Sequence, residues 1–289
     1  MAAPPDDGSI GDHFGDDGPI VSVAWLRARL GQPGVRVVDV RPANAYAAAH
    51  IPGAAPTTLA AIRLDRSAPD AIARFAAALS DEVRRLGVRP GEKVVFVEDV
   101  SGTMAARAVW ALDYLGHGGG ALLDGGLVAW AAAGGALTRD PTPPEPPGDL
   151  SVVPDPTVLV TADELLAGIA GSAGGHGAGA SGSPPLPVDS RGDAEYALGT
   201  IPGAVHVDWT RHLRPDGRLR PPSELRALYA EAGLPDDPDR PLATFCGSGY
   251  RAAHAYVVLR ALGHRRVGNY VPSWNEWGAR ADLPVTPGR

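Results

Sequence analysis

The sequence contains one cysteine, Cys246, and its thiol is the best candidate for a reactive side chain. Cys246 begins the segment Cys-Gly-Ser-Gly-Tyr-Arg. Gly247 and Gly249 leave the backbone free to curl, so that successive N–H groups turn inward as a nest for an anion. The apolar run 242–245 before the segment predicts a strand. The pattern after it predicts a helix, whose N-terminal end adds positive potential. This setting favours the nucleophilic thiolate over the thiol.

A lone cysteine without such a setting is more often a buried apolar residue. The flanking glycines and the helix start favour a reactive Cys246 instead, and the same cradle suits a persulfide, which is also an anion. A single cysteine cannot form an intrachain disulfide or a multi-cysteine zinc site. We therefore expect covalent catalysis with no metal and no organic cofactor.

The loop offers further candidate substrate-binding residues besides the backbone of Gly247 and Gly249. Arg251 could pair with the anionic end of a substrate, or it could face solvent. Ser248 could donate its hydroxyl to substrate or persulfide, or it could cap the helix. Tyr250 is expected to line the mouth of the site.

The elements that must position this loop occur twice in the chain. Val-Asp-Val-Arg at 38–41 recurs 150 residues later as Val-Asp-Ser-Arg, and Ile-Pro-Gly-Ala at 51–54 recurs at the same offset. The segment 104–117 recurs with an offset of 147 residues as 251–264. Repeats this long indicate two duplicated globular domains rather than a solenoid. At the second offset, Cys246 corresponds to Asp99. A carboxylate cannot act as a sulfur nucleophile, so the first copy is expected to be catalytically silent.

Each copy alternates β-rich runs with helical patterns, which predicts an α/β fold of two tandem domains, each a mostly parallel sheet flanked by helices. Thr161 and Glu164 form a capping-box pattern at the start of one helix. The expected strands are 35–39, 94–97, 121–123, 158–160, 186–189, 242–245 and 267–270. The expected helices are 71–86, 104–115, 223–232 and 251–262.

Composition sets the expected domain boundaries and the expected location. We expect a flexible leader (1–18), a non-catalytic domain (19–138), a proline-rich linker (139–156) and a catalytic domain (157–289), with a flexible Gly/Ser/Pro-rich insertion at 171–187. His176 in the insertion is expected to be incidental. The net charge of −7 argues against nucleic-acid binding. No run is apolar enough to cross a membrane and the acidic leader is no secretory signal, so a cytoplasmic location is expected.

These motifs, in duplicated order, resemble the tandem rhodanese family over about residues 19–283. The segment 123–127 with Trp130, and Trp-Asn-Glu-Trp at 274–277, add to the resemblance. It implies two rhodanese-like domains and a thiosulfate or 3-mercaptopyruvate sulfurtransferase. Cys246 would take sulfur from a small anionic donor and pass it to a thiophilic acceptor such as cyanide or a thiol. An inactive first domain is usual in this family.

The resemblance adds candidates outside the loop. In mercaptopyruvate-type relatives, a histidine at the position of His50 approaches the loop serine, here Ser248, across the domain interface; a purely structural histidine is the alternative. Arg191 follows the strand 186–189 and could bind substrate, or it could brace the loop by pairing with Asp189.

Loop length and neighbouring charges bear on the substrate. Phosphatases with a rhodanese-like fold place an arginine six positions after the cysteine, whereas Arg251 is five positions after Cys246, which favours sulfur over phosphate. Cys-Gly-Ser-Gly resembles the mercaptopyruvate branch. However, Glu195 stands where those enzymes carry a second arginine, and Tyr-Arg replaces their Val-Thr. We expect thiosulfate to be the donor, with 3-mercaptopyruvate as the alternative donor. Two alternative functions are a persulfide carrier for a partner protein and a purely structural binding module.

Overall fold

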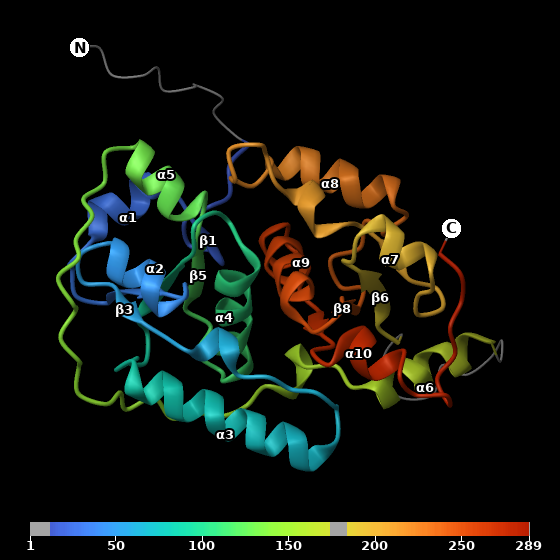
Figure 1. Cartoon of the computed structure of the whole chain (residues 1–289). Coiled ribbons are helices and arrows are strands. Elements are labelled where there is room, and N and C mark those ends of the chain that lie inside the picture. Colours follow the sequence, from blue (N-terminus) through green and yellow to red (C-terminus); the bar gives the residue numbers. More distant parts are fainter. Residues whose placement is uncertain (1–11, 174–183, 289) are drawn as a thin grey trace.

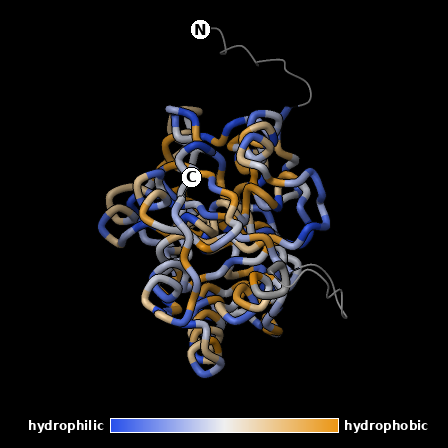
Figure 2. The backbone as a smooth tube through the Cα atoms, turned by 90° about the vertical axis from the view of Figure 1, so that its right-hand side faces the viewer, coloured by the Kyte–Doolittle hydropathy of each residue, from blue (hydrophilic) through white to orange (hydrophobic). Residues whose placement is uncertain are grey.

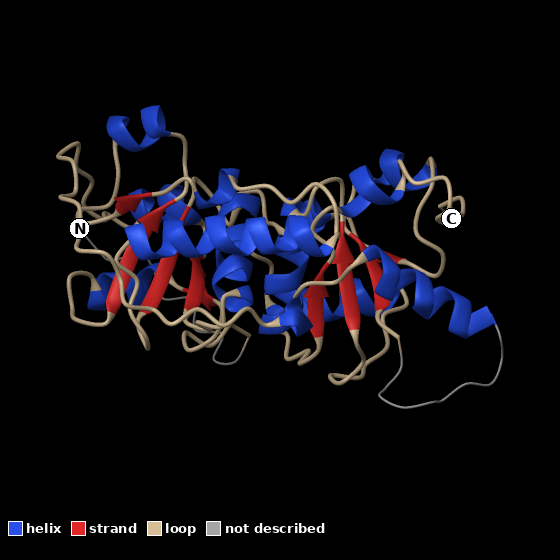
Figure 3. Cartoon of the chain, turned by 90° about the horizontal axis from the view of Figure 1, so that it is seen from below, coloured by secondary structure: helices blue, strands red, loops and turns tan. Residues whose placement is uncertain are grey.

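The computed structural model describes residues 12–173 and 184–288, which form two parallel sheets with helices between and around them (Figures 1 and 3). The sheet of the N-terminal domain has the strand order β1-β5-β4-β2-β3. Its strands are β1 (Ile20–Val21), β2 (Val35–Asp39), β3 (Ala55–Pro56), β4 (Lys93–Val97) and β5 (Gly120–Leu123). The nearly continuous apolar sequence of β4 is typical of a parallel strand that is buried on both faces.

The sheet of the C-terminal domain has the order β7-β6-β8-β9, and every neighbouring pair is parallel. Its strands are β6 (Leu186–Asp189), β7 (Val205–His206), β8 (Leu242–Phe245) and β9 (Val267–Asn269). The two domains and the α/β class are as predicted. Hydrophobic and hydrophilic stretches alternate along the tube in Figure 2, as expected when elements bury one side.

Helices α4 (Thr103–Tyr114) and α9 (Tyr250–Ala261) lie side by side between the sheets (Figure 1). Nine residues of α4 and eight of α9 are buried, and one cluster of buried side chains runs through both domains. The two domains therefore share a core-like interface rather than a loose hinge. The other helices are α1 (Val23–Arg29), α2 (Ala43–Ala48), α3 (Pro69–Arg85), α5 (Gly126–Ala132), α6 (Ala162–Ala173), α7 (Asp193–Ala197), α8 (Pro222–Glu231) and α10 (Ser273–Trp277), with short 3₁₀ segments η1 (Leu59–Ala61), η2 (Pro156–Val158) and η3 (Trp209–His212).

A chain of hydrogen bonds crosses this interface. His254 Nε2 lies 2.9 Å from the Ser101 carbonyl oxygen of the N-terminal domain, so it must donate. His254 Nδ1 then accepts from His212 Nδ1 at 3.1 Å, and His212 Nε2 accepts from the Tyr229 hydroxyl at 3.0 Å. Both imidazoles are fully buried and neutral in this arrangement. Burial lowers the pKa of His254 to about 4 and that of His212 well below its ordinary value.

One predicted strand is wrong. Residues 158–160 do not form a strand, because the Asp155 side chain accepts from the Thr157 N–H and closes the 3₁₀ turn η2. Only Leu159 bridges to Asn269. The predicted capping box is confirmed: the Thr161 N–H donates to Glu164 at 2.8 Å and the Glu164 N–H to the Thr161 hydroxyl at 3.2 Å.

The leader and the insertion, which were predicted to be flexible, are only partly described, whereas the proline-rich linker is described throughout. Of the leader, residues 12–18 are placed, and Asp12 accepts a hydrogen bond from the Ser223 N–H of α8. Residues 139–155 contain no helix or strand and pack against the N-terminal domain, where the Gly148 N–H donates to Arg84 and the Asp155 N–H to Tyr114. Within the expected insertion, residues 171–173 are helical and 186–187 belong to β6, which corrects its ends. Residues 184–185 precede the strand, and residues 174–183, with His176, lie outside the described residues.

Candidate active site

The candidate site lies at the carboxyl edge of the C-terminal sheet, where open α/β sheets place their ligands. Strands β6 and β8 run in parallel register, with Asp189 paired to Phe245. Cys246 follows β8 directly and is 1 % exposed. The resting thiol is therefore shielded from bulk solvent at the point where the strand gives way to α9.

Backbone contacts hold the cysteine loop in one shape. The Gly249 N–H donates to the Cys246 Sγ at 3.2 Å. Gly249 has a φ of +84°, and a Cβ there would lie 2.6 Å from the Val271 carbonyl oxygen, so only glycine fits. From the opposite side, the Cys246 N–H donates to the Ser273 hydroxyl and its carbonyl accepts from Trp274. The N-terminus of α9 and an N–H group thus face the sulfur, an arrangement that favours an anion there.

Ser248 is half-buried and does not cap α9. The cap residue is Gly249, and no side-chain hydrogen bond caps the helix. The helix-capping alternative for Ser248 is therefore wrong. The Ser248 side chain lines a cavity beside the loop instead.

Arg251 is paired with Glu195 rather than facing solvent alone. Its Nη1 and Nη2 atoms donate to the two carboxylate oxygens at 2.5 and 2.9 Å. These hydrogen bonds to Glu195 raise the pKa of Arg251, and the same bonds lower the pKa of Glu195. The guanidinium also lies at the loop, 3.2 Å from where a Cβ of Gly247 would be. Substrate binding by Arg251 stays a prediction. It requires that a substrate anion either displace the Glu195 carboxylate or bind the Arg251 guanidinium beside it.

Arg191 takes the bracing role of its two predicted alternatives. It is 2 % exposed, donates to Asp189 at 2.6 Å and to the Gly199 carbonyl at 2.6 Å, and lies over the Trp274 ring. Asp189 also accepts from Thr200 at 2.8 Å. Both charged groups are thus used inside the domain, and the substrate-binding alternative for Arg191 finds no support.

The first copy has the same arginine–aspartate pair, but its arginine makes one additional contact. Arg41 donates to Asp39 at 2.7 Å and to the Ala49 carbonyl at 2.6 Å, as its counterpart does in the second copy. A third contact, at 3.1 Å, goes to Asp99, the residue at the position of Cys246. The first copy therefore holds an ion pair where the second holds a sulfur atom.

The predicted approach of His50 to Ser248 is wrong. His50 is fully buried and stacks on Tyr46, with ring centroids 3.8 Å apart. Its ring nitrogens contact the carbonyls of Tyr46 at 2.8 Å and Asp140 at 3.1 Å. The reason is local, because the His50 backbone pairs with Thr138 and keeps the imidazole under the chain that leaves the domain. The structural alternative is the one observed.

Two arginines of the N-terminal domain lie beside the loop and were not among the residues predicted from the sequence. The Tyr250 hydroxyl donates to the Ala60 carbonyl at 2.5 Å, which brings its ring 5.8 Å from the Arg63 guanidinium and 5.7 Å from that of Arg107. Arg107 corresponds to His254 in the internal repeat. The available signal was that the repeat aligns these two polar residues within the predicted helices 104–115 and 251–262.

Arg107 is an unusual buried cation. It is 2 % exposed, and its Nε and Nη1 atoms have no hydrogen-bond partner among the described residues. Its guanidinium lies 5.2 Å from the Phe75 ring centroid and 4.5 Å from that of Trp110. Burial lowers the pKa of Arg107 to about 10, while its attraction to Tyr250 and Cys246 opposes the shift. A buried donor group without a partner is costly, so its presence calls for an explanation.

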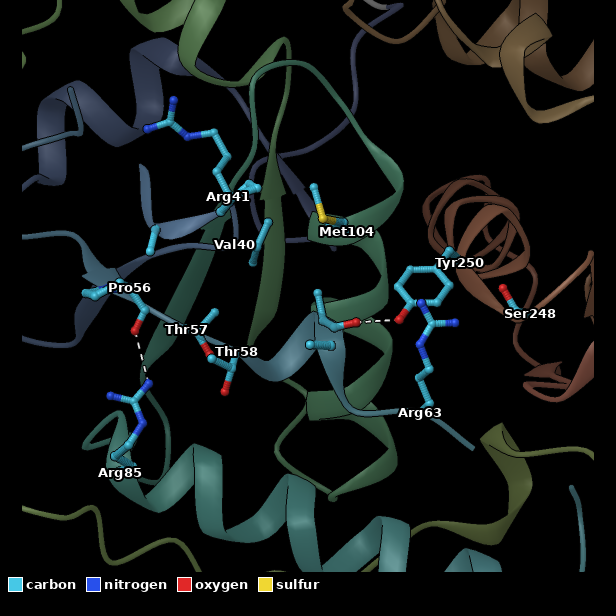
Figure 4. A pocket seen from close by; sticks show the side chains of 14 residues that line it. Val40, Arg41, Pro56, Thr57, Thr58, Arg63, Arg85, Met104, Ser248 and Tyr250 are labelled. Carbon is cyan, nitrogen blue, oxygen red and sulfur yellow. Dashed lines mark hydrogen bonds between the residues drawn. The ribbon is translucent and has the colours of Figure 1, made fainter. Parts of the chain in front are cut away.

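A cavity of about 830 Å³ opens beside Ser248 and Tyr250 (Figure 4). All its other lining residues belong to the N-terminal domain: Val40, Arg41, Pro42, Ala43, Pro56, Thr57, Thr58, Ala60, Ala61, Arg63, Arg85 and Met104. Within the described ranges, no cluster of three or more His, Cys, Asp or Glu side chains is placed to hold a metal ion, and no helix is long and apolar enough to span a membrane.

Comparisons with known proteins agree with this geometry. A thiosulfate sulfurtransferase from Azotobacter vinelandii is 33 % identical over 277 residues, which cover 95 % of this chain and 99 % of that protein. The sulfur carrier protein TtuD from Thermus thermophilus is 33 % identical over 293 residues, 93 % of this chain and 96 % of that protein. SseA from Escherichia coli, a 3-mercaptopyruvate sulfotransferase with a rhodanese fold, superposes with a TM-score of 0.71 at 26 % identity and covers 89 % and 99 % of the two chains. Residues 22–133 and 178–280 each match the rhodanese-like domain. The chain therefore belongs to the rhodanese-like family and carries two of its domains in tandem.

Proposed function

We propose that this protein is a sulfurtransferase in which Cys246 carries sulfur as a persulfide. The observation that carries the proposal is the setting of the Cys246 Sγ, which accepts the Gly249 N–H at 3.2 Å at the N-terminus of α9. This setting supports an anion at the sulfur both before and after it has taken up a second sulfur atom. The chain's similarity to sulfurtransferases over nearly its whole length supports the same activity.

The reaction has two steps. The Cys246 thiolate attacks the outer sulfur of thiosulfate, the S–S bond of the donor breaks, and sulfite leaves with the bonding electron pair. The persulfide then gives its outer sulfur to a thiophilic acceptor: cyanide becomes thiocyanate and the Cys246 thiolate is restored. Such covalent catalysis gives ping-pong kinetics.

The charges around the sulfur have distinct parts in this proposal. Arg251 interacts with Cys246 but shares its charge with Glu195, whereas the guanidinium of Arg107, which is also attracted to Cys246, has no carboxylate partner among the described residues. We assign to Arg107 the stabilisation of the thiolate and persulfide across the domain interface. The first domain (19–138) would then supply no reacting group but would place a positive charge near Cys246. The domain from 157 onward would be catalytic.

Thiosulfate is the proposed donor. Several similar proteins are thiosulfate sulfurtransferases, and Glu195 places a carboxylate where a substrate carboxylate would be repelled. 3-Mercaptopyruvate is the second candidate, which the superposition on SseA supports. Sulfur delivery to a protein acceptor is a further candidate, since TtuD is a sulfur carrier protein. The cytoplasmic location stays a prediction.

Donor-resolved kinetics test the proposal. Sulfite release from thiosulfate and pyruvate release from 3-mercaptopyruvate are measured with cyanide as acceptor, in the wild type and in Cys246→Ser. We expect thiosulfate to give the higher kcat/KM and Cys246→Ser to release no sulfite. Sulfite release by the variant would contradict the proposal. Turnover of neither donor, with persulfide formed from a desulfurase, would favour the carrier.

A further inference from the structure

The cavity beside the loop is much larger than the proposed donor requires. Its volume of about 830 Å³ falls in the range of roughly 300–1,000 Å³ that holds drug-sized ligands, whereas thiosulfate has five non-hydrogen atoms. Ser248, two positions from Cys246, lines one part of the cavity, and the N-terminal domain lines most of the rest. The cavity therefore offers room for a second substrate beside the cysteine loop, next to Ser248.

The charges in the cavity indicate what that substrate carries. Of its three arginines, Arg41 is paired with Asp39 and Asp99, and Arg85 is paired with Glu82. Arg63 is exposed and, among the described residues, forms no ion pair with a carboxylate. No acidic residue lines the cavity within the described part of the chain. Arg63 is thus the guanidinium that is free to bind an anionic group.

Figure 4 shows how this guanidinium lies relative to the loop. Arg63 lies next to the Tyr250 ring, with Ser248 on one side and Arg41 and Arg85 on the other. The remaining surface is largely apolar, from side chains such as those of Met104 and Ala61. A ligand that fits has a reactive end toward Ser248, a carboxylate at Arg63 and a mostly uncharged body.

We propose that this cavity binds the sulfur acceptor, and that the acceptor is a small organic thiol with a carboxylate that pairs with Arg63. The inference rests on the proposed persulfide of Cys246. In the transfer, the acceptor sulfur bonds to the outer sulfur of the persulfide, the S–S bond to Cys246 breaks with its electron pair going to Cys246, and the acceptor leaves as a persulfide. The concave shape and the volume favour a small molecule over a protein segment.

The test separates the two half-reactions. The persulfide is formed with thiosulfate, the donor is removed, and the rate of persulfide loss is measured with glutathione, which carries carboxylates, and with 2-mercaptoethanol, which does not. Arg63→Met removes one charge-assisted hydrogen bond to the acceptor, so we expect it to slow the reaction with glutathione by roughly 10-fold and to change the 2-mercaptoethanol rate less than about 2-fold. Arg63→Lys should retain part of the glutathione rate. Arg66→Met, which removes an exposed arginine outside the cavity, is the matched control and should leave both rates unchanged.

A second variant tests the cavity rather than the charge. Thr58 lines it with an exposed side chain away from the loop, so Thr58→Trp should fill the space and slow the reaction with glutathione but not that with cyanide. Equal slowing of both thiols in Arg63→Met, or an unchanged glutathione rate in both variants, would overturn the acceptor site. Failure of the persulfide to form at all would instead overturn the proposed function.

Discussion

Replacing Arg107 by methionine should separate stability from reactivity. The guanidinium is buried, and two of its nitrogens lack hydrogen-bond partners among the described residues. Its pKa falls to about 10 because burial disfavours the charge. A pKa shift of that size corresponds to a cost of about 3 kcal/mol for keeping the guanidinium charged in the folded state at neutral pH. The unfolded chain does not have this cost, because its arginine is solvated. Methionine fills similar volume without charge, and replacing buried charges by apolar groups is often neutral or stabilising.

The effect on the sulfur has the opposite sign. By Coulomb's law, at an effective dielectric constant of about 20, a guanidinium within roughly 10 Å of a thiolate stabilises it by about 2 kcal/mol or more. Removing it should make alkylation of Cys246 by iodoacetamide roughly 10- to 100-fold slower near neutral pH. The variant also removes cation–π interactions with Phe75, Trp110 and Tyr250. For a desolvated cation each is worth up to about 2 kcal/mol, so together they offset most or all of the stability gain.

The two effects are measured on the same variant: urea unfolding gives its stability, and the alkylation rate gives the reactivity of Cys246. We expect Arg107→Met to unfold at a urea concentration close to that of the wild type and to react more slowly. Arg74→Met, at an exposed position of α3, should change neither. A large loss of stability would show that Arg107 is structural. A stable variant with unchanged alkylation would refute its action on the sulfur.

Two further predictions concern charged groups near the loop and the interface. Glu195→Gln removes the negative charge that Arg251 faces and leaves one acceptor oxygen instead of two, so the KM for thiosulfate in steady-state assays should fall about 3- to 10-fold. An unchanged or higher KM would argue against anion binding by Arg251. For His254, the folded-state pKa of about 4 lies below the ordinary 6.5, so the unfolded state binds the proton first as the pH falls and stability is lost between about pH 6.5 and 4. From pH 7 to pH 5 this loss is about 2 kcal/mol, and urea unfolding of His254→Gln should show correspondingly less pH dependence than the wild type; an equal dependence would contradict the neutral histidine chain.

The sequence predicted the fold well where the pattern was local. Apolar runs located β6 and β8, and the repeat predicted two copies with a carboxylate in place of Cys246. It predicted a strand at 158–160 because β-branched residues favour strands. The Asp155 cap and Pro156 instead start a 3₁₀ turn.

Predictions that depended on tertiary contacts were less accurate. Nothing local in the sequence shows that Arg251 meets Glu195, 56 residues away, or that His50 turns toward Asp140 rather than Ser248. The arginines that the N-terminal domain brings to Tyr250 follow from the packing of α4 against α9, which a single sequence does not reveal. The repeat aligns Arg107 with His254, and only the structure shows that both side chains are buried.

The mass of the intact protein after brief exposure to thiosulfate tests the persulfide of Cys246 most directly. We predict that the chain gains one sulfur atom, that peptide mapping places it on Cys246, and that one equivalent of sulfite is released. Cyanide should remove the added mass, and Cys246→Ser should never acquire it. An unchanged mass in the wild type while sulfite is released, or sulfur on the Cys246→Ser protein, would contradict the persulfide.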